Sequence, residues 1–160
     1  MHSVNKEINI DIINKVEFLN GYLNALSSVD GKIGQFFSRV DFFCSTEEEL
    51  FEDIKKKFGS QVSFKFTNKE RIDKNPMKIF ELALRSFILS GTNEDIVESK
   101  VLSDKRRYIS FKIMDMIDFL NLDGFPFLVI IDVDSDAIDS KFYALFFDND
   151  CLLFLFERNY

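Results

Sequence analysis

The sequence predicts a single α+β domain with a mixed β-sheet of about five strands, a C-terminal antiparallel hairpin or meander, and about four helices packed on the sheet. Three observations support this prediction. Residues 125–157 fit three strands joined by two acidic loops, and their apolar residues stand at successive positions. Such strands are covered on both faces and belong in the middle of a sheet. Upstream, four segments have helical spacing, and no linker divides residues 1–160.

Apolar spacing predicts the first helix over residues 11–28, where Asp11 can cap the start. A capping box predicts the start of the second helix, because Ser45 is followed three residues later by Glu48. Gly59 can adopt the left-handed conformation that ends this helix. In both segments apolar residues recur at steps of three and four, which gives each helix one apolar face.

The third helix is expected to begin at Asn75, a good capping residue, followed by Pro76, and to end before Gly91. Residues 92–103 are polar, and we expect a loop there with a turn of helix. Residues 104–121 have helical spacing, although YISFKIMDM within them would also fit a strand, and we favour the helix.

Two strands are predicted before the C-terminal region. Residues 36–44 are rich in aromatic and β-branched side chains, although they would also suit a helix face. Residues 61–67 alternate between apolar and polar side chains, which predicts a strand with one solvated face. The order strand, helix, strand favours a parallel pair joined by a right-handed crossover.

The C-terminal strands are predicted at residues 127–133, 142–148 and 151–157. Asn149 and Asp150 resemble a two-residue hairpin turn, because both residue types tolerate positive φ better than most. The last two strands should therefore be antiparallel neighbours.

Several functional classes are disfavoured by what the sequence lacks. There is no apolar run of about 20 residues and no basic region followed by an apolar block at the N-terminus, so we expect a cytoplasmic protein without membrane contact. Cys44 and Cys151 lie in apolar segments and are expected as buried thiols. The only histidine is His2, which disfavours a Ser–His or Cys–His catalytic pair. No glycine-rich phosphate loop occurs, and we expect neither a cofactor nor an enzyme.

Charge is the most informative feature of the sequence. Residues 123–160 carry eight acids and two bases, a formal charge of −6, which leaves −1 of the total −7 for the rest of the chain. Such a field attracts a basic protein partner and repels phosphates, so no nucleic acid is expected as a ligand. The basic runs 55–57 and 105–107 are interpreted as solvated helix ends. The candidate partner-binding residues are Asp132, Asp134, Asp136 and Asp139, with Asp148 and Asp150 if the hairpin tip lies nearby.

Three alternatives remain for the acidic loop 132–139 and the hairpin that follows it. The loop begins like a calcium site, but Ala137 stands where the tight turn needs glycine and Tyr143 where a bidentate glutamate is required. A metal-dependent hydrolase or nuclease-like enzyme that uses this loop is one alternative. A solvated loop that protects strand ends is another. The third is a non-catalytic oligomeric or adaptor subunit, such as a homodimer formed through the C-terminal hairpin.

The acidic loop DVDSDAID, residues 132–139, and the hairpin KFYALFFDNDCLLFLFE, residues 141–157, belong to a small acidic chain without a catalytic motif. In this profile the chain resembles the immunity proteins that bacteria carry beside polymorphic or contact-dependent growth inhibition toxins. The resemblance covers size and charge, and it transfers no residue roles. It implies a stoichiometric inhibitor of a cognate toxin, often a nuclease, in which aspartates take the place of substrate phosphates against the toxin's lysines and arginines.

Overall fold

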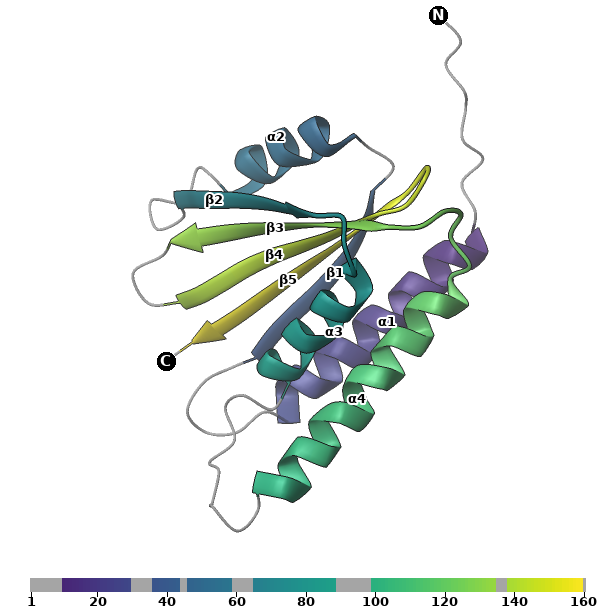
Figure 1. Cartoon of the computed structure of the whole chain (residues 1–160), viewed down its shortest axis with the longest axis vertical. Helices are drawn as coiled ribbons and strands as arrows, with labels where there is room; N and C mark the ends of the chain where they lie inside the picture. Colours follow the sequence, from purple (N-terminus) through teal and green to yellow (C-terminus); the bar gives the residue numbers. More distant parts are fainter. Residues whose placement is uncertain are drawn as a thin grey trace, which may run out of the picture.

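Four helices and five strands make up the part of the chain that the computed structural model describes, which is residues 10–29, 36–43, 46–58, 65–88, 99–134 and 138–159 (Figure 1). This confirms the predicted α+β class. None of the helices in these ranges is both long and apolar enough to cross a membrane. In chain order the elements are α1 (Ile10–Val29), β1 (Phe36–Phe43), α2 (Glu47–Phe58), β2 (Lys65–Ile72), α3 (Pro76–Phe87), α4 (Ser99–Phe119), β3 (Phe127–Asp134), β4 (Ile138–Phe146) and β5 (Cys151–Asn159).

The sheet has the order β1-β5-β4-β3-β2, and every neighbouring pair is antiparallel. The prediction of a mixed sheet is therefore wrong. The two strands expected as a parallel pair, β1 and β2, lie at opposite edges, because β5 is the partner of β1 and β3 is the partner of β2. The β4–β5 hairpin lies inside the sheet with both of its hydrogen-bonding edges occupied, so it offers no free edge to a second copy of the chain.

Both faces of the central strands are buried, as their continuous apolar sequence predicts. Helices α1, α3 and α4 cover one face and α2 covers the other (Figure 1). Along β5, Leu152, Phe154 and Phe156 belong to the core under the three helices, whereas Cys151 and Leu153 belong to the core under α2. Cys151 is a buried thiol outside any disulfide, as predicted.

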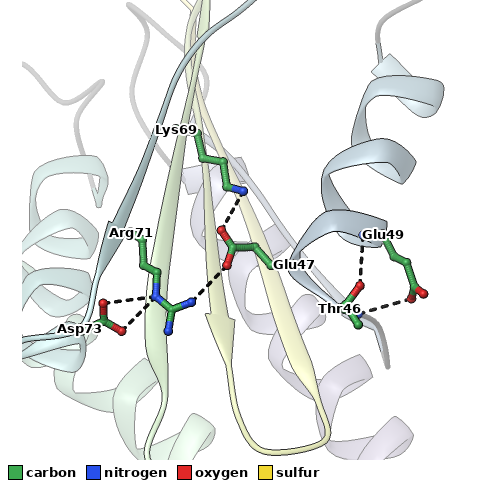
Figure 2. A network of polar contacts seen from close by, with 6 residues as sticks. All are labelled: Thr46, Glu47, Glu49, Lys69, Arg71 and Asp73. Atoms are coloured by element: carbon green, nitrogen blue, oxygen red, sulfur yellow. Dashed lines mark hydrogen bonds and ion pairs between the residues drawn. The ribbon is translucent and has the colours of Figure 1, made fainter.

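Three helix starts differ in detail from their predictions. The capping box of α2 lies one residue later than expected: Glu49 N donates to Thr46 Oγ1 (3.3 Å) and Thr46 N donates to Glu49 Oε2 (3.4 Å) (Figure 2). Asn75 precedes α3 in a left-handed conformation with φ of 53°, and its side chain caps nothing. Helix α4 begins at Ser99, five residues before the predicted start, and the strand alternative for YISFKIMDM is wrong.

Two strands are displaced along the chain from their predicted positions. Strand β2 runs later than residues 61–67, and β4 begins four residues before the predicted residue 142. In the β4–β5 turn Phe147 N donates to Asp150 O (2.8 Å), so the central residues are Asp148 and Asn149, and neither has positive φ. Predictions that concern the following residues lie outside the described part of the chain: His2, Cys44, Ser45, Gly59, 61–64 and 92–98.

The two edges of the sheet are protected differently. At β1, the amide of Asn20 in α1 bonds both backbone groups of Val40: Asn20 Nδ2 donates to Val40 O and Val40 N donates to Asn20 Oδ1, each at 2.6 Å. At β2, lysine and arginine side chains and a register shift between Phe66 and Asn68 make pairing with another strand unfavourable. Both edges of the sheet are therefore protected, which leaves the ends of the strands as candidate binding surfaces.

Candidate binding surfaces at the two ends of the sheet

The structure divides the predicted partner-binding residues between opposite ends of the sheet. In the β3–β4 register, Val133 pairs with Ser140 at one end and Phe127 pairs with Phe146 at the other. The end of β3 and the start of β4 therefore lie a full strand length from the β4–β5 turn (Figure 1). Three of the predicted residues, Asp132, Asp134 and Asp139, lie at the first end, Asp148 and Asp150 lie at the second, and Asp136 is outside the described residues.

At the β3–β4 end, Asp132 and Asp134 stand opposite lysines on neighbouring strands. Asp132 Oδ1 lies 3.4 Å from Lys141 Nζ, in an ion pair between directly opposed residues of β3 and β4. Asp134 is directly opposite Lys65 in the β2–β3 register. Asp139 is paired in the β4–β5 register with Arg158. Opposite charges on adjacent strands attract each other, so the ion pair with Lys141 compensates Asp132, and Lys65 reduces the field of Asp134.

At the β4–β5 end, the turn and the segment 121–126 form one acidic surface. Asp148 N donates a hydrogen bond to Asp123 O (3.0 Å), which ties the turn to the connection between α4 and β3. Neither residues 121–126 nor residues 146–151 include a lysine or arginine. Among the described residues, no side chain forms an ion pair with Asp123 or Asp148. The carboxylates Asp123 and Asp148 therefore give this end an uncompensated negative field, and Asp150 lies in the same turn.

The backbone of segment 121–126 is held in an unusual conformation. Asn121 has φ of 53° where α4 ends, and Gly124 has φ of 92°. A Cβ atom at Gly124 would lie 2.1 Å from Asp148 Oδ1, so the carboxyl group of Asp148 occupies the space that only glycine leaves open. The next residue, Phe125, is 99% exposed, although the sequence suggested that it begins the apolar core strands. The flanking Gly124 and Pro126 are the signal that could have placed this ring in a loop.

Comparison with known proteins leaves the family open. The sequence matches no protein-family model and no curated protein. The likeness to bacterial immunity proteins accordingly stays a prediction from the profile of the chain.

The outer side of α2 is a further acidic surface that the sequence prediction missed. Only Glu48 enters that prediction, as part of a capping box, although the spacing of the α2 carboxylates by three and four places them on one side of the helix. Glu49 belongs to the capping box, and Glu52 lies 3.7 Å from Lys55 Nζ. The side chains line a shallow hollow of about 460 Å³, formed by Glu48, Glu49, Glu52, Asp53 and Lys56.

Glu47, the first residue of α2, fastens this helix to strand β2. Its carboxylate lies 2.7 Å from Lys69 Nζ and 3.3 Å from a terminal nitrogen of Arg71 (Figure 2). Arg71 also bonds Asp73 at 3.0 Å, and its guanidinium lies 3.8 Å from the centre of the Phe127 ring. The charges of this network are engaged in holding α2 over the sheet, so we assign the network a structural role.

A buried polar cluster joins α3 to α4. Glu81, only 4% exposed, accepts hydrogen bonds from Ser110 Oγ (2.9 Å) and from Arg85 Nε. Arg106 Nε donates to Ile88 O (3.0 Å) where α3 ends. The basic run 105–107, expected at a solvated helix end, thus lies within α4, and one of its members supports the packing of α3.

Two groups have pKa values raised by their surroundings. Burial raises the pKa of the Glu157 carboxyl, which is half-buried on the α2 side of the sheet opposite Ser140. Burial and the nearby Tyr108 raise the pKa of the Tyr22 hydroxyl between α1 and α4. Within the described ranges, no group of three or more His, Cys, Asp or Glu side chains could hold a metal ion. Neither titrating group belongs to a constellation suited to catalysis.

Proposed function

We propose that this chain is a cytoplasmic, non-catalytic immunity protein that binds a basic bacterial toxin, most simply a nuclease, and blocks its active site with an acidic surface. The observation that supports this most is the β4–β5 end of the sheet. There Asp123 and Asp148 are carried on two segments joined by a backbone hydrogen bond, and no basic side chain lies in either segment.

Occlusion follows from the chemistry of such a surface. A nuclease cleft is lined by lysine and arginine side chains that bind phosphates, and a fixed group of carboxylates presents a similar pattern of negative charge. Complementary fields of this kind accelerate encounter and favour one orientation of the partner. The net charge of −7 adds a general attraction for a cationic protein.

The β3–β4 end is less suited to this role because lysines already stand opposite two of its aspartates. Asp132 would have to leave Lys141 before it could meet a cation of the partner, and Asp134 stands opposite Lys65. Of the predicted partner-binding residues, we therefore assign the principal contribution to Asp148, with Asp150 in the same turn, and we add Asp123. The metal-dependent alternative rested on the loop 132–139, and no feature of the described residues favours it.

The test expresses the chain together with the protein encoded by the adjacent gene. Wild-type chain should rescue growth and form a complex with that protein. The triple variant D123N/D148N/D150N should slow association roughly tenfold or more at low salt, because steering depends on the local field. Near 0.5 M salt this difference should largely disappear, since screening then acts over about 4 Å.

A matched control is the triple variant D132N/D134N/D139N, which removes the same charge from the opposite end of the sheet. This control should slow association clearly less than D123N/D148N/D150N does. A neighbouring protein that is neither toxic nor bound by the wild-type chain would refute the proposed function. Equal slowing by the two triple variants would keep a basic partner but remove the assignment to the β4–β5 end.

A further inference from the structure

Phe125 is the most exposed aromatic ring of the described chain, at 99% against 69% for Phe18, Tyr108 and Phe119. Phe119 is 69% exposed but lies under Lys15 Nζ, 4.3 Å from the ring centre. Phe111 is 45% exposed and has two arginine side chains near its ring. Phe125 is 99% exposed, and among the described residues it makes no ring or cation contact. Its whole apolar surface is therefore available to a partner.

The segment that carries Phe125 is fixed before any partner arrives. Asn121 and Gly124 both have positive φ, and the hydrogen bond from Asp148 N to Asp123 O joins the segment to the β4–β5 turn. Pro126 restricts the backbone on the other side of the ring. The backbone of such a segment loses little conformational freedom on binding, so that only the side-chain torsions of the ring have to be ordered, which suits an anchor residue.

The charges around the ring indicate the chemistry of the surface that would receive it. Asp123 precedes Phe125 by two residues, and Asp148 contacts the neighbouring Gly124. A partner that covers the ring must therefore combine an apolar pocket with lysine or arginine side chains around it. A second copy of the chain would bring further carboxylates to this site and is disfavoured by charge.

From these observations we infer that Phe125 is the apolar anchor of the interface, inserting into a pocket rimmed by cations on the basic toxin partner. This inference rests on the proposed function and adds that association and dissociation depend on different residues. The carboxylates at the β4–β5 end determine the association rate, and the ring determines the dissociation rate. Interface hot spots have this arrangement, with a desolvated aromatic residue inside a polar rim.

The experiment measures association and dissociation rates for the inactivated toxin domain encoded by the adjacent gene. F125A should raise the dissociation rate about 30-fold or more and change the association rate less than threefold, because truncation of an anchor acts mainly on dissociation. The dissociation rate of F125L should lie between those of F125A and wild type. The matched control is F18A, which removes another exposed phenylalanine, in α1, and should change neither rate.

The outcomes separate the two proposals. If the wild-type chain forms no complex with this domain, the proposed function fails and the anchor fails with it. If the wild-type chain binds and F125A binds with the same dissociation rate, the anchor is refuted while the proposed function stands. A loss of association rate alone in F125A would also refute the anchor. Thermal unfolding of F125A and F125L should match the wild type, since the removed atoms are exposed.

Discussion

The two ends of the sheet carry aspartates in similar number but differ in what stands opposite them. At the β3–β4 end the acids belong to strands, and the antiparallel register places Lys141 opposite Asp132 and Lys65 opposite Asp134. At the β4–β5 end the acids belong to a turn and to the segment 121–126, where no ladder partner exists. Lysines thus stand opposite two of the strand carboxylates, whereas Asp123 and Asp148 lie in connections and keep their field for a partner.

The largest effect is expected from the backbone of the β4–β5 end. G124A should lower the free energy of unfolding by about 1–3 kcal/mol, because alanine is strained at a φ of 92° and its Cβ would meet the Asp148 carboxyl group. The measurement is urea unfolding followed by circular dichroism. The double variant G124A/D148A should recover the part of this lost unfolding free energy that comes from the clash with the carboxyl group. The part that comes from backbone strain should remain.

Gly21 provides the matched control for this prediction. It lies within α1, and a Cβ built there has no neighbour within 4 Å. G21A should therefore raise the free energy of unfolding by about 0.5–1 kcal/mol, the usual gain for alanine in a helix interior. If G124A proved as stable as wild type, the segment 121–126 would not be fixed as described, and the contrast between the two ends would weaken.

Much of the fold could be predicted because it depends on local pattern. Continuous apolar runs in residues 127–133 and 151–157 indicated burial on both faces, and the structure confirms it. The partner of β1 could not be predicted in this way. Val40 pairs with Phe154, far away along the chain, and the order strand, helix, strand is compatible with several pairings. The parallel pair was therefore the wrong choice among topologies that share one local pattern.

The binding surface was less predictable than the fold, for the same physical reason. The sequence located the excess of carboxylates, but their compensation depends on register, which brings Lys65 opposite Asp134 from a distant segment. Asp123 counted toward the acidic region, yet nothing local indicated that its backbone bonds Asp148. Phe125 was included in the apolar stretch 125–157, although the first strand was predicted only from residue 127, and the flanking glycine and proline are the local features that distinguish it.

A smaller effect on the free energy of unfolding should distinguish the carboxylates of the two ends. D132N and D148N each remove one negative charge and keep the side-chain shape, so general relief of repulsion in this acidic chain is the same in both. D132N should lose about 0.5–1 kcal/mol of stability because it breaks the cross-strand pair with Lys141. D148N should be neutral or slightly stabilising.

Salt provides the check on this pair of variants. The side chains of Asp132 and Lys141 are 36% and 40% exposed, so their attraction is open to screening. The difference in unfolding free energy between D132N and D148N should shrink between low salt and about 0.5 M salt. If the two variants shift stability equally at low salt, charge compensation does not distinguish the two ends.

The smallest effect concerns Glu157, which belongs to the β3–β4 end but is governed by burial. Because burial raises the pKa of its carboxyl, the folded state holds this proton more tightly than the unfolded chain does. Its contribution to stability is fully present below the ordinary value of 4.5 and is lost as the pH rises through the raised pKa. E157Q has no charge to bury, so its stability relative to wild type should increase between about pH 4 and about pH 7.

Urea unfolding of both proteins across that interval measures the trend, and a constant difference would show that Glu157 is solvated like an exposed acid. S140A should leave the trend unchanged, because Ser140 Oγ makes no hydrogen bond within the described part of the chain.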